Sequence, residues 1–372
     1  MKKFSFLIWP TVSGILIALL ILQFRLQISP PLQPVINKVD LKTVRVPNQK
    51  IPETASNNFV LSYADAVDKA APAVVNVYIK RNESTAASDS NVSTNNTHSS
   101  LGSGVILNEQ GYIITNNHVV DKADEIIVAL QDGRETVAKI IGTDTGTDIA
   151  LLKINLPRLP VITIEQSHSL RVGDVVLAIG NPFDFGQTVT KGIISAKSRD
   201  SVGLTRYENF LQTDAAINPG NSGGALINTR GNMIGISTAI FTKSGGSNGI
   251  GFAIPSSLAL KVIKNLIENG RVIRGWLGVD TQEITPQLAE SFGLSNARGL
   301  ILAGVTVGGP ADQAGLQAGD LILAFNNMSI ISGLASMRSI AEVAPGTTIK
   351  VDFVRNGESL SANIIVGERP SN

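Results

Sequence analysis

The sequence contains no cysteine, only three histidines, few aromatic residues and no excess of charge of either sign. Among its 372 residues, aromatic side chains make up 5% and charged side chains 16%, and the formal net charge is +1. The absence of cysteine excludes disulfides, thiolate metal sites and thiol nucleophiles, and it leaves the redox compartment open. Balanced charge without a basic cluster interleaved with aromatic residues argues against nucleic-acid binding. Stability must therefore come from ordinary hydrophobic cores.

One long uncharged apolar stretch lies near the N-terminus. It covers residues 4–24, and at about 1.5 Å per residue it is long enough to cross a bilayer as a helix. Lys2 and Lys3 precede it, so we expect residues 1–3 to be a cytoplasmic tip and residues 4–24 an uncleaved transmembrane anchor. A cleaved signal peptide is the alternative, but residues 23–27 lack a small-x-small cleavage pattern. Residues 25–57 show no helical or strand periodicity and are expected to be a linker.

The rest of the chain predicts two mainly β domains. Short apolar or alternating runs lie between Gly and Asn/Asp turns, and many short strands at close spacing indicate a sandwich or barrel. The first domain, 58–273, is expected to end in a helix whose apolar positions recur at helical spacing up to Asn269-Gly270. The second, 274–368, has strands of its own. The expected strands are 73–79, 104–107, 112–115, 125–130, 137–141, 149–152, 175–179, 193–195, 225–228, 233–237, 251–254, 299–305, 321–325 and 349–353.

Two further segments have a clear local character. Ser62 can cap a short helix over 64–70 that ends before Pro72. The Ser/Thr/Asn-rich tract 83–100 is expected to be a flexible surface loop.

Residues Gly220–Gly224 match the pattern Gly-x-Ser-x-Gly, with Ser222 as a candidate nucleophile. A tight glycine-rich turn would give the same letters, and an α/β-hydrolase would also use them, but its base histidine follows the serine. Here His98, His118 and His168 all precede Ser222. The order His, Asp, Ser is that of the double-barrel serine proteases, which agrees with the many short strands.

His118 is the best candidate for the base. It directly follows the predicted strand 112–115, and a strand end can hold an imidazole firmly. His98 lies in the low-complexity tract, and His168 lies in a polar connection.

Asp148 is the best candidate for the orienting acid, because it opens the apolar run 149–152, a predicted buried strand. Asp144 and Asp174 are the rivals, but both lie in turns where a solvated aspartate is normal. Asp214 lies too close to the serine to be preferred. We expect neither a metal nor a cofactor.

The glycines beside Ser222 suit an oxyanion hole. Two backbone N–H groups must converge on one point, and glycine readily takes the positive φ that such a turn requires. Gly220 and Ser222 would donate, with Asn221 between them contributing mainly through its backbone. We expect Ala216, Ile217 and Ser237 to line the substrate pocket. Ala216 stands six residues before Ser222, where trypsin-like enzymes carry an aspartate, so cleavage is expected after small aliphatic residues.

Three blocks of sequence resemble the signatures of the HtrA/Deg serine proteases. They are Thr115–Val120 (Thr-Asn-Asn-His-Val-Val), Thr147–Leu151 (Thr-Asp-Ile-Ala-Leu) and Asp214–Gly224 (Asp-Ala-Ala-Ile-Asn-Pro-Gly-Asn-Ser-Gly-Gly). The resemblance extends from about residue 58 to the C-terminus. It implies a chymotrypsin-like double β-barrel and ATP-independent endoprotease activity.

The C-terminal part resembles the PDZ domain of the same family. Arg274–Val279 resembles its carboxylate-binding loop, and Gly309–Leu316 with Gly319–Ile322 matches its other signature. Trp276, Leu277, Gly278 and Val279 would then bind a peptide C-terminus, which adds a strand to the sheet edge. A plain hairpin turn is the alternative.

One PDZ domain and an uncleaved anchor resemble the DegS-like branch of the family. That branch implies an inner-membrane homotrimer with its catalytic domains in the periplasm. It implies activation by C-termini of misfolded outer-membrane proteins and a first cut in a membrane-bound anti-sigma factor. Arg199 matches the position of a family arginine that couples the PDZ domain to the oxyanion loop, although a surface arginine in a turn is equally compatible. A soluble quality-control protease of the DegP/DegQ type and a binding protein with a dormant protease fold remain alternatives.

Overall fold

The computed structural model describes residues 62–82, 97–181, 186–240, 248–291, 298–330 and 332–370. The expected anchor at 4–24 and the linker at 25–57 lie outside these ranges. Within them, no helix has both the length and the apolar character needed to cross a membrane.

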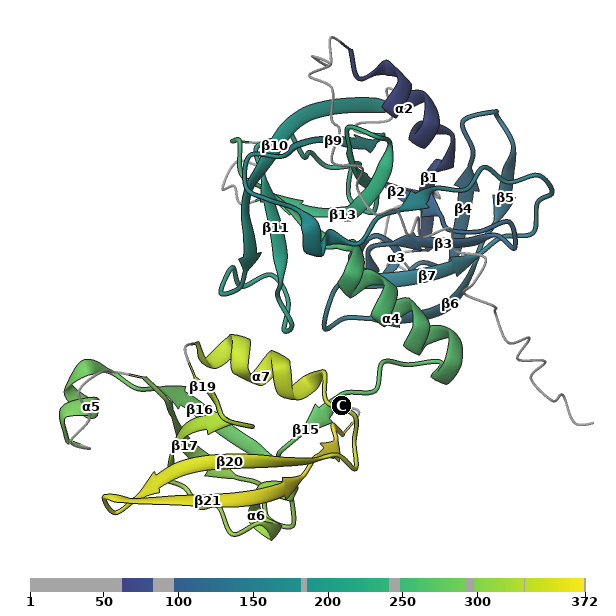
Figure 1. The fold of residues 1–372 in the computed structure, drawn as a ribbon. Helices are drawn as coiled ribbons and strands as arrows, with labels where there is room; N and C mark the ends of the chain where they lie inside the picture. The colour runs from purple at the N-terminus through teal and green to yellow at the C-terminus, as the bar shows by residue number, and fades with distance from the viewer. Residues whose placement is uncertain are drawn as a thin grey trace, which may run out of the picture. The chain divides into compact units, whose positions relative to one another are not determined.

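A seven-stranded antiparallel sheet forms the first half of the protease domain (Figure 1). Its strands run in the order β5-β4-β1-β2-β3-β7-β6, and no ladder between the described strands β5 and β6 joins its two ends. Helix α2 (Ala64–Ala70) precedes it, as expected, and a short 3₁₀ turn containing Pro72 follows the helix. The N-cap residue is Tyr63 and not Ser62, although the Ser62 hydroxyl accepts from the Ala64 N–H at 3.2 Å. The strands are β1 (Val74–Asn82), β2 (Thr97–Ile106), β3 (Tyr112–Thr115), β4 (Glu125–Ala129), β5 (Glu135–Val137), β6 (Lys139–Asp144) and β7 (Ile149–Lys153), with the one-turn helix α3 (Asn117–Val120) after β3.

The second half is a closed barrel. Its strands follow the order β12-β9-β10-β11-β14-β13, and pairing of β12 with β13 completes the ring, while β8 adds a parallel edge to β13. The strands are β8 (Thr163–Ile164), β9 (Val175–Gly180), β10 (Thr188–Arg199), β11 (Phe210–Thr213), β12 (Ala225–Asn228), β13 (Asn232–Ile240) and β14 (Gly251–Pro255).

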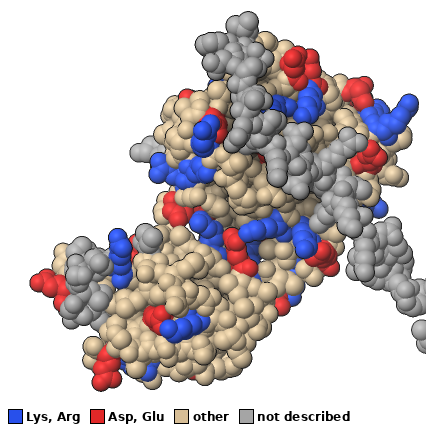
Figure 2. All heavy atoms as spheres, viewed as in Figure 1, with Lys and Arg blue, Asp and Glu red and all other residues tan. Residues whose placement is uncertain are grey.

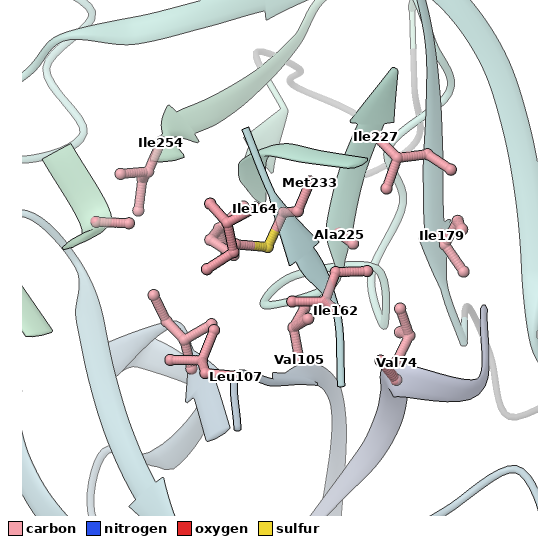
Figure 3. Packing of buried hydrophobic residues seen from close by; sticks show 14 of the residues in the cluster. Val74, Val105, Leu107, Ile162, Ile164, Ile179, Ala225, Ile227, Met233 and Ile254 are labelled. Atoms are coloured by element: carbon pink, nitrogen blue, oxygen red, sulfur yellow. The ribbon is translucent and has the colours of Figure 1, made fainter. Parts of the chain in front are cut away.

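Alternate residues of the central strands pack on two sides. In β7, Ala150 and Leu152 point into the first sheet's interior, whereas Ile149 and Leu151 join a core shared with the second barrel. In β9, residues 176 and 178 fill the second barrel, and residues 177 and 179 join the same shared core. Figure 3 shows residues of both halves, including Val105 and Ile227, meeting in this shared core. Because both faces are buried, these strands read as continuous apolar runs in the sequence.

Helix α4 (Ser256–Asn269) covers one side of this core. Its residues 259, 262, 263 and 266 belong to the shared cluster. It ends, as the sequence predicts, at Gly270, whose φ of 70° is the left-handed conformation of a helix C-cap.

The C-terminal domain is built around a second, smaller sheet in the order β16-β17-β18-β20-β21, with β19 paired to β18 and a separate β15–β22 pair. Its elements are β15 (Gly275–Trp276), β16 (Val279–Glu283), α5 (Pro286–Ser291), β17 (Leu300–Val305), α6 (Pro310–Gln313), β18 (Leu321–Phe325), β19 (Met328–Ser329), α7 (Gly333–Ala341), β20 (Thr348–Arg355), β21 (Glu358–Ile365) and β22 (Gly367–Glu368). Leu302, Val351 and Ile364 are among the residues of its own buried core.

The structure corrects several expected boundaries. Strand β2 begins at Thr97, where its backbone pairs with Asn82, so the end of the tract 83–100 is strand and not loop. The single run 137–141 is divided between β5 and β6. Strand β10 is much longer than the expected 193–195, and β11 and β21 were not anticipated.

On the face shown in Figure 2, charged residues of both signs are interspersed.

Candidate active site

Pairing of two strands brings the predicted base and acid together. Strand β3 ends at Thr115, which pairs with Ala150 at the start of β7. The residues just outside this pair, after β3 and before β7, are therefore neighbours. The Asn116 side-chain amide and the Asn117 N–H both donate to the carbonyl oxygen of Asp148, at 2.9 and 3.1 Å. The His118 backbone is thus fixed to the Asp148 backbone before the side chains meet.

The two side chains form the pair that the sequence predicts. His118 Nδ1 lies 2.7 Å from Asp148 Oδ2, and the His118 N–H donates to Asp148 Oδ1 at 2.9 Å. The imidazole is about half exposed and the carboxylate only 12% exposed. Asp148 has a φ of 60°, uncommon for a non-glycine residue, which turns its side chain back toward α3. Since Nδ1 faces the carboxylate, Nε2 is left for a proton from the substrate side.

A third residue links this pair to Ser222. The Thr238 hydroxyl on β13 donates to Asp148 Oδ2 at 2.7 Å, and the Thr238 carbonyl accepts from Ser222 Oγ at 3.0 Å. Thr238 therefore lies between Ser222 and the His118–Asp148 pair, and the Ser222 hydroxyl donates to Thr238 and not to the imidazole. Catalytic hydrogen bonds are often looser before substrate binds.

The loop that carries Ser222 is fixed on both sides by backbone hydrogen bonds to β13. Gly223 N–H donates to Ser237 O at 2.8 Å, and Ser237 N–H donates to Gly224 O at 2.9 Å. Gly220 and Gly223 have φ values of 101° and 83°. A Cβ on Gly223 would also run into the Ser103 carbonyl and the hydroxyl of Thr115. Glycine at this position is thus required both by conformation and by space.

The three residues expected at the oxyanion hole have different surroundings. The Asn221 N–H donates to Asn218 O at 3.0 Å, so it closes the turn. Its side chain is buried, and its amide donates to Ala216 O at 3.3 Å. Asn221 therefore shapes the loop, which leaves the N–H groups of Gly220 and Ser222 as the candidate donors.

The expected substrate-pocket residues are placed unequally. Ala216 is half-buried beside the nucleophile loop, and its carbonyl accepts from the Thr190 hydroxyl at 2.8 Å. Ile217 is 1% exposed and packs inside the second barrel. Ser237 is fully buried under the loop. Of the three, only Ala216 is partly exposed.

The rival aspartates have structural roles. Asp144 is buried, contrary to the expected solvated turn; it accepts from Thr147 and forms a two-pronged ion pair with Arg274 at 2.8 and 2.6 Å. Asp174 accepts from the Arg171 N–H in a turn at 2.8 Å. Asp214 accepts from the Ile193 N–H at 2.7 Å.

Of the other two histidines, His168 lies where the sequence predicts and His98 does not, because it is on a strand and not in a loop. His168 lies in an exposed 3₁₀ turn. His98 is on β2, outside the residues whose side chains are described. Among the described residues, no group of three or more acidic or histidine side chains could hold a metal ion.

Arg199 differs from its expected setting. It is the last residue of strand β10 and not part of a turn. Its side chain is exposed, and Nε donates to Gln212 Oε1 at 2.8 Å.

The expected peptide-binding loop of the second domain leads into its edge strand β16. The carbonyls of Leu277 and Gly278 accept from Ala311 and Thr306, each at 2.8 Å. Because a trans peptide points its N–H opposite to its carbonyl, the N–H groups of Gly278 and Val279 face away from these partners. Gly278 has a φ of 75°. Trp276 is half-buried beside it, and Leu277 belongs to the core.

Two residues of the site were not identified from the sequence, Thr238 and Ser103. Thr238 lies on a strand far from the histidine block, and no local pattern marks it. Ser103 contacts the nucleophile loop from β2. Both are recognisable only once the two halves of the domain are packed.

Comparison with known proteins agrees with this geometry. Residues 102–236 match the trypsin-like peptidase domain, and residues 275–366 match the PDZ domain. The serine endoprotease DegS of Salmonella typhimurium is 48% identical over 315 residues, covering 83% of this chain and 87% of that protein. DegS of Escherichia coli K12 is 47% identical over 314 residues, with the same coverage. A probable periplasmic DegP-like serine endoprotease of Pseudomonas putida is 49% identical over 271 residues, which cover 73% of this chain and 57% of that protein.

Solved structures give the same result. The HtrA-type protease AlgW with a decapeptide is 50% identical, with a TM-score of 0.75, and covers 84% of this chain and all of that one. The serine endoprotease of Yersinia pestis is 46% identical, with a TM-score of 0.65, and covers 86% of this chain and all of that one. Protease and PDZ domains, in this order and at this identity, show that the chain belongs to the HtrA/DegS family of trypsin-like serine endoproteases.

Proposed function

We propose that Ser222, His118 and Asp148 form the catalytic triad of a membrane-anchored, PDZ-regulated endoprotease of the bacterial periplasm. The observation that carries the triad is the Asp148 carboxylate, which contacts both His118 and Thr238, while the Thr238 carbonyl holds Ser222. One carboxylate thus organises both the base and the strand residue beside the nucleophile.

The proposed chemistry follows from this arrangement. The Ser222 side chain turns from Thr238 O to His118 Nε2, transfers its proton there and attacks the scissile carbonyl. Asp148 keeps Nδ1 protonated and stabilises the imidazolium that forms. The N–H groups of Gly220 and Ser222 stabilise the tetrahedral oxyanion. His118 then returns the proton to the leaving amine.

Peptide hydrolysis by triad variants of the full-length chain tests these roles. Ser222→Ala and His118→Ala should abolish turnover above background. Asp148→Asn should lower kcat by about 10⁴-fold, because the imidazole loses its orienting acceptor. Asp174→Asn is a matched control, since that carboxylate is bound in a remote turn. Equal losses in Asp174→Asn and Asp148→Asn would contradict the assignment.

We also propose selectivity for small aliphatic residues before the scissile bond. Ala216 brings no negative charge to the pocket, so an incoming Lys or Arg would lose hydration without gaining an ion pair. A peptide library should show fastest cleavage after residues such as Val or Ala. Fastest cleavage after Lys or Arg would contradict this proposal.

The second domain is proposed to bind peptide C-termini. Support comes from the outward N–H groups of Gly278 and Val279, from the position of β16 at the sheet edge and from helix α7 packed near β16. An added strand would pair with β16 while its carboxylate meets the N–H groups of the loop. Trp276 and Leu277 shape that loop.

By resemblance to the DegS-like branch, the physiological ligands are proposed to be C-termini of misfolded outer-membrane proteins. The substrate is proposed to be a membrane-bound anti-sigma factor cut at its first site, and Arg199 is proposed to relay the signal. The proposed state is a homotrimer anchored by residues 4–24, with boundaries at 58–273 and 274–368 for the two domains.

Activation by peptides tests this regulation. Cleavage by the full-length chain in detergent should rise when a peptide with a porin-type hydrophobic C-terminus is added. The same peptide with an amidated C-terminus is the control, because it lacks the carboxylate. Arg199→Ala should reduce activation without reducing peptide binding. Equal activity with and without every such peptide would contradict the regulatory proposal. The trimer is tested separately, by measuring the molar mass of the protein with light scattering.

A general quality-control protease of the DegP/DegQ type is the second candidate, because a DegP-like protein is 49% identical over the shared region. Membrane fractionation distinguishes the two. Recovery in the soluble periplasmic fraction would favour the DegP/DegQ type, and recovery in the inner membrane would favour the DegS type.

A further inference from the structure

Ser103 lies on β2, and its side chain is fully buried beneath the nucleophile loop. Its hydroxyl oxygen accepts from the Asn181 N–H at 3.0 Å and lies 2.7 Å from the Gly220 carbonyl oxygen. An amide N–H can only donate and a carbonyl can only accept, so the single hydroxyl hydrogen of Ser103 must point to Gly220.

The backbone of Ser103 holds the same loop at a second point. Its N–H donates to the Ser222 carbonyl at 2.8 Å. Its own carbonyl accepts from the Thr115 hydroxyl at 2.7 Å, at the end of the strand that leads to His118. One residue of β2 thus contacts the loop through Gly220 and Ser222, whose N–H groups are the candidate oxyanion donors.

Gly220 is the residue of that loop whose backbone conformation depends most on its hydrogen bonds. Glycine has no Cβ to restrict its dihedrals, so its own covalent structure does not fix the peptide units around it. With φ at 101°, the direction of the 220–221 peptide depends on what holds its two ends. One end is the Gly220 carbonyl, held by Ser103, and the other is the Asn221 N–H, held by Asn218 O. Loss of the Ser103 hydroxyl would leave a buried carbonyl unpaired and free this peptide to turn. The 220–221 peptide carries neither donor itself, but it lies between the 219–220 and 221–222 peptides that carry the Gly220 and Ser222 N–H groups, so its direction affects both.

Two neighbouring positions have space only for glycine beside Ser103. A Cβ on Gly180 would lie 3.1 Å from the Ser103 hydroxyl, and a Cβ on Gly223 would run into the Ser103 carbonyl. Two glycines therefore let the loop approach β2 closely enough for this hydroxyl to reach Gly220.

We propose that Ser103 is a positioning residue of the oxyanion hole, acting through the Gly220 carbonyl to set the direction of the two N–H donors. The role rests on the proposed functions of Gly220 and Ser222. It also differs from a purely structural role, because a buried serine that only satisfied backbone groups would affect folding without affecting transition-state binding.

Ser103→Ala in the full-length chain tests the proposal, with any activating peptide held at saturation. Removing an oxyanion donor costs about 10²- to 10³-fold in rate, and loosening one should cost less, roughly 10- to 100-fold in kcat with KM changed less than about twofold. A peptide aldehyde, which forms a tetrahedral adduct with the nucleophile, should lose affinity by the same factor. The corresponding peptide alcohol, which forms none, should bind as before.

Ser256→Ala is the matched control. Ser256 is also fully buried, and its hydroxyl donates to a backbone carbonyl, that of Glu165, at 2.6 Å. It lies outside the candidate site, so this variant should lose a similar amount of thermal stability while keeping kcat and aldehyde affinity.

Three outcomes distinguish the possibilities. The pattern above supports the proposal. A Ser103→Ala enzyme whose kcat and aldehyde affinity stay within about twofold of the parent, or whose aldehyde and alcohol affinities fall together, contradicts it. A parent chain that hydrolyses no peptide under any condition contradicts instead the proposed function on which this role rests.

Discussion

At the scale of single residues, Thr238 is the contact that joins the two halves of the protease domain at their chemistry. Its hydroxyl and its carbonyl act on different partners, Asp148 and Ser222. The side chain is 3% exposed, so no solvent water competes for the carboxylate from that side. A donor fixed by a strand keeps the Asp148 carboxylate aimed at His118 during proton transfer.

Replacing Thr238 with Val tests this contact. Valine keeps the shape but removes the donor, leaving a buried carboxylate oxygen short of one hydrogen bond, a loss worth about 1–3 kcal/mol. If that loss falls on the transition state, kcat should fall roughly 10- to 100-fold. Thr238→Ser keeps the hydroxyl and should retain most activity. Equal kcat values for the Val and Ser variants in a steady-state peptide assay would contradict the role.

How much of the site the sequence predicts depends on how local each residue's marker is. His118, Asp148 and Ser222 each lie in a short block beside a strand, and their order along the chain distinguishes the fold type. Thr238 and Ser103 have no such marker, because their contacts join segments far apart in the sequence. Asp144 shows the opposite case. Its Gly- and Thr-rich neighbours predict a solvated aspartate in a turn, but the residue is buried in an ion pair with Arg274.

At the scale of elements, the two helices predicted from the sequence, α2 and α4, are present, but α3, α5, α6, α7 and several strands were not predicted. The amphipathic spacing and Gly270 define α4 locally. Strand β21 was missed although its apolar residues 360, 362 and 364 alternate with polar ones; most of this strand is exposed. Strand β10 alternates, but polar residues such as Thr188 and Thr190 occupy much of its pattern. Edge position and register are set by partners that the local sequence does not contain.

The end of α4 gives a test of one such local signal. Gly270 adopts a φ of 70°, and its surroundings leave open space for a methyl group, so substitution by Ala changes only backbone strain. Gly270→Ala should lower the free energy of unfolding by about 1 kcal/mol, measured by urea unfolding followed by circular dichroism. Asn269→Ala, in the last helical residue, is the control and should be close to neutral. No difference between the two variants would contradict the role of Gly270 as a cap.

The Glu165 carboxylate, which directly follows β8, gives a pH-dependent test of stability. Burial raises the pKa of Glu165, but hydrogen bonds from Arg230, Asn232 and Asn228 outweigh it and leave the pKa below its ordinary value of 4.5. A lowered pKa means that the ionised form stabilises the fold above that ordinary value. This stability is lost as the pH falls through the lower value of the folded state.

Glu165→Gln should therefore destabilise the protein by roughly 1 kcal/mol at neutral pH and by less near about pH 3.5. Glu125→Gln removes one partner of the exposed Lys80–Glu125 pair and should have little effect at either pH. Urea midpoints at the two pH values give the comparison. A destabilisation by Glu165→Gln that stays constant with pH would contradict the electrostatic origin.

At the scale of the whole molecule, the sequence predicts a trypsin-like protease domain followed by a PDZ domain, and both are confirmed by the matched segments 102–236 and 275–366. The reason is physical: each domain has its own buried cluster and its own turn chemistry. Regulation belongs to this scale, because it requires the two domains to communicate. That communication, the anchor and the assembly remain proposals.

The central claim is that Ser222 is the activated nucleophile of this endoprotease. Labelling of the full-length chain with a fluorophosphonate probe, followed by mass spectrometry of its peptides, tests it most directly. The account predicts one adduct, on Ser222, with labelling strongly slowed in His118→Ala and absent in Ser222→Ala. An adduct on another residue, or proteolysis that survives in Ser222→Ala, would contradict it.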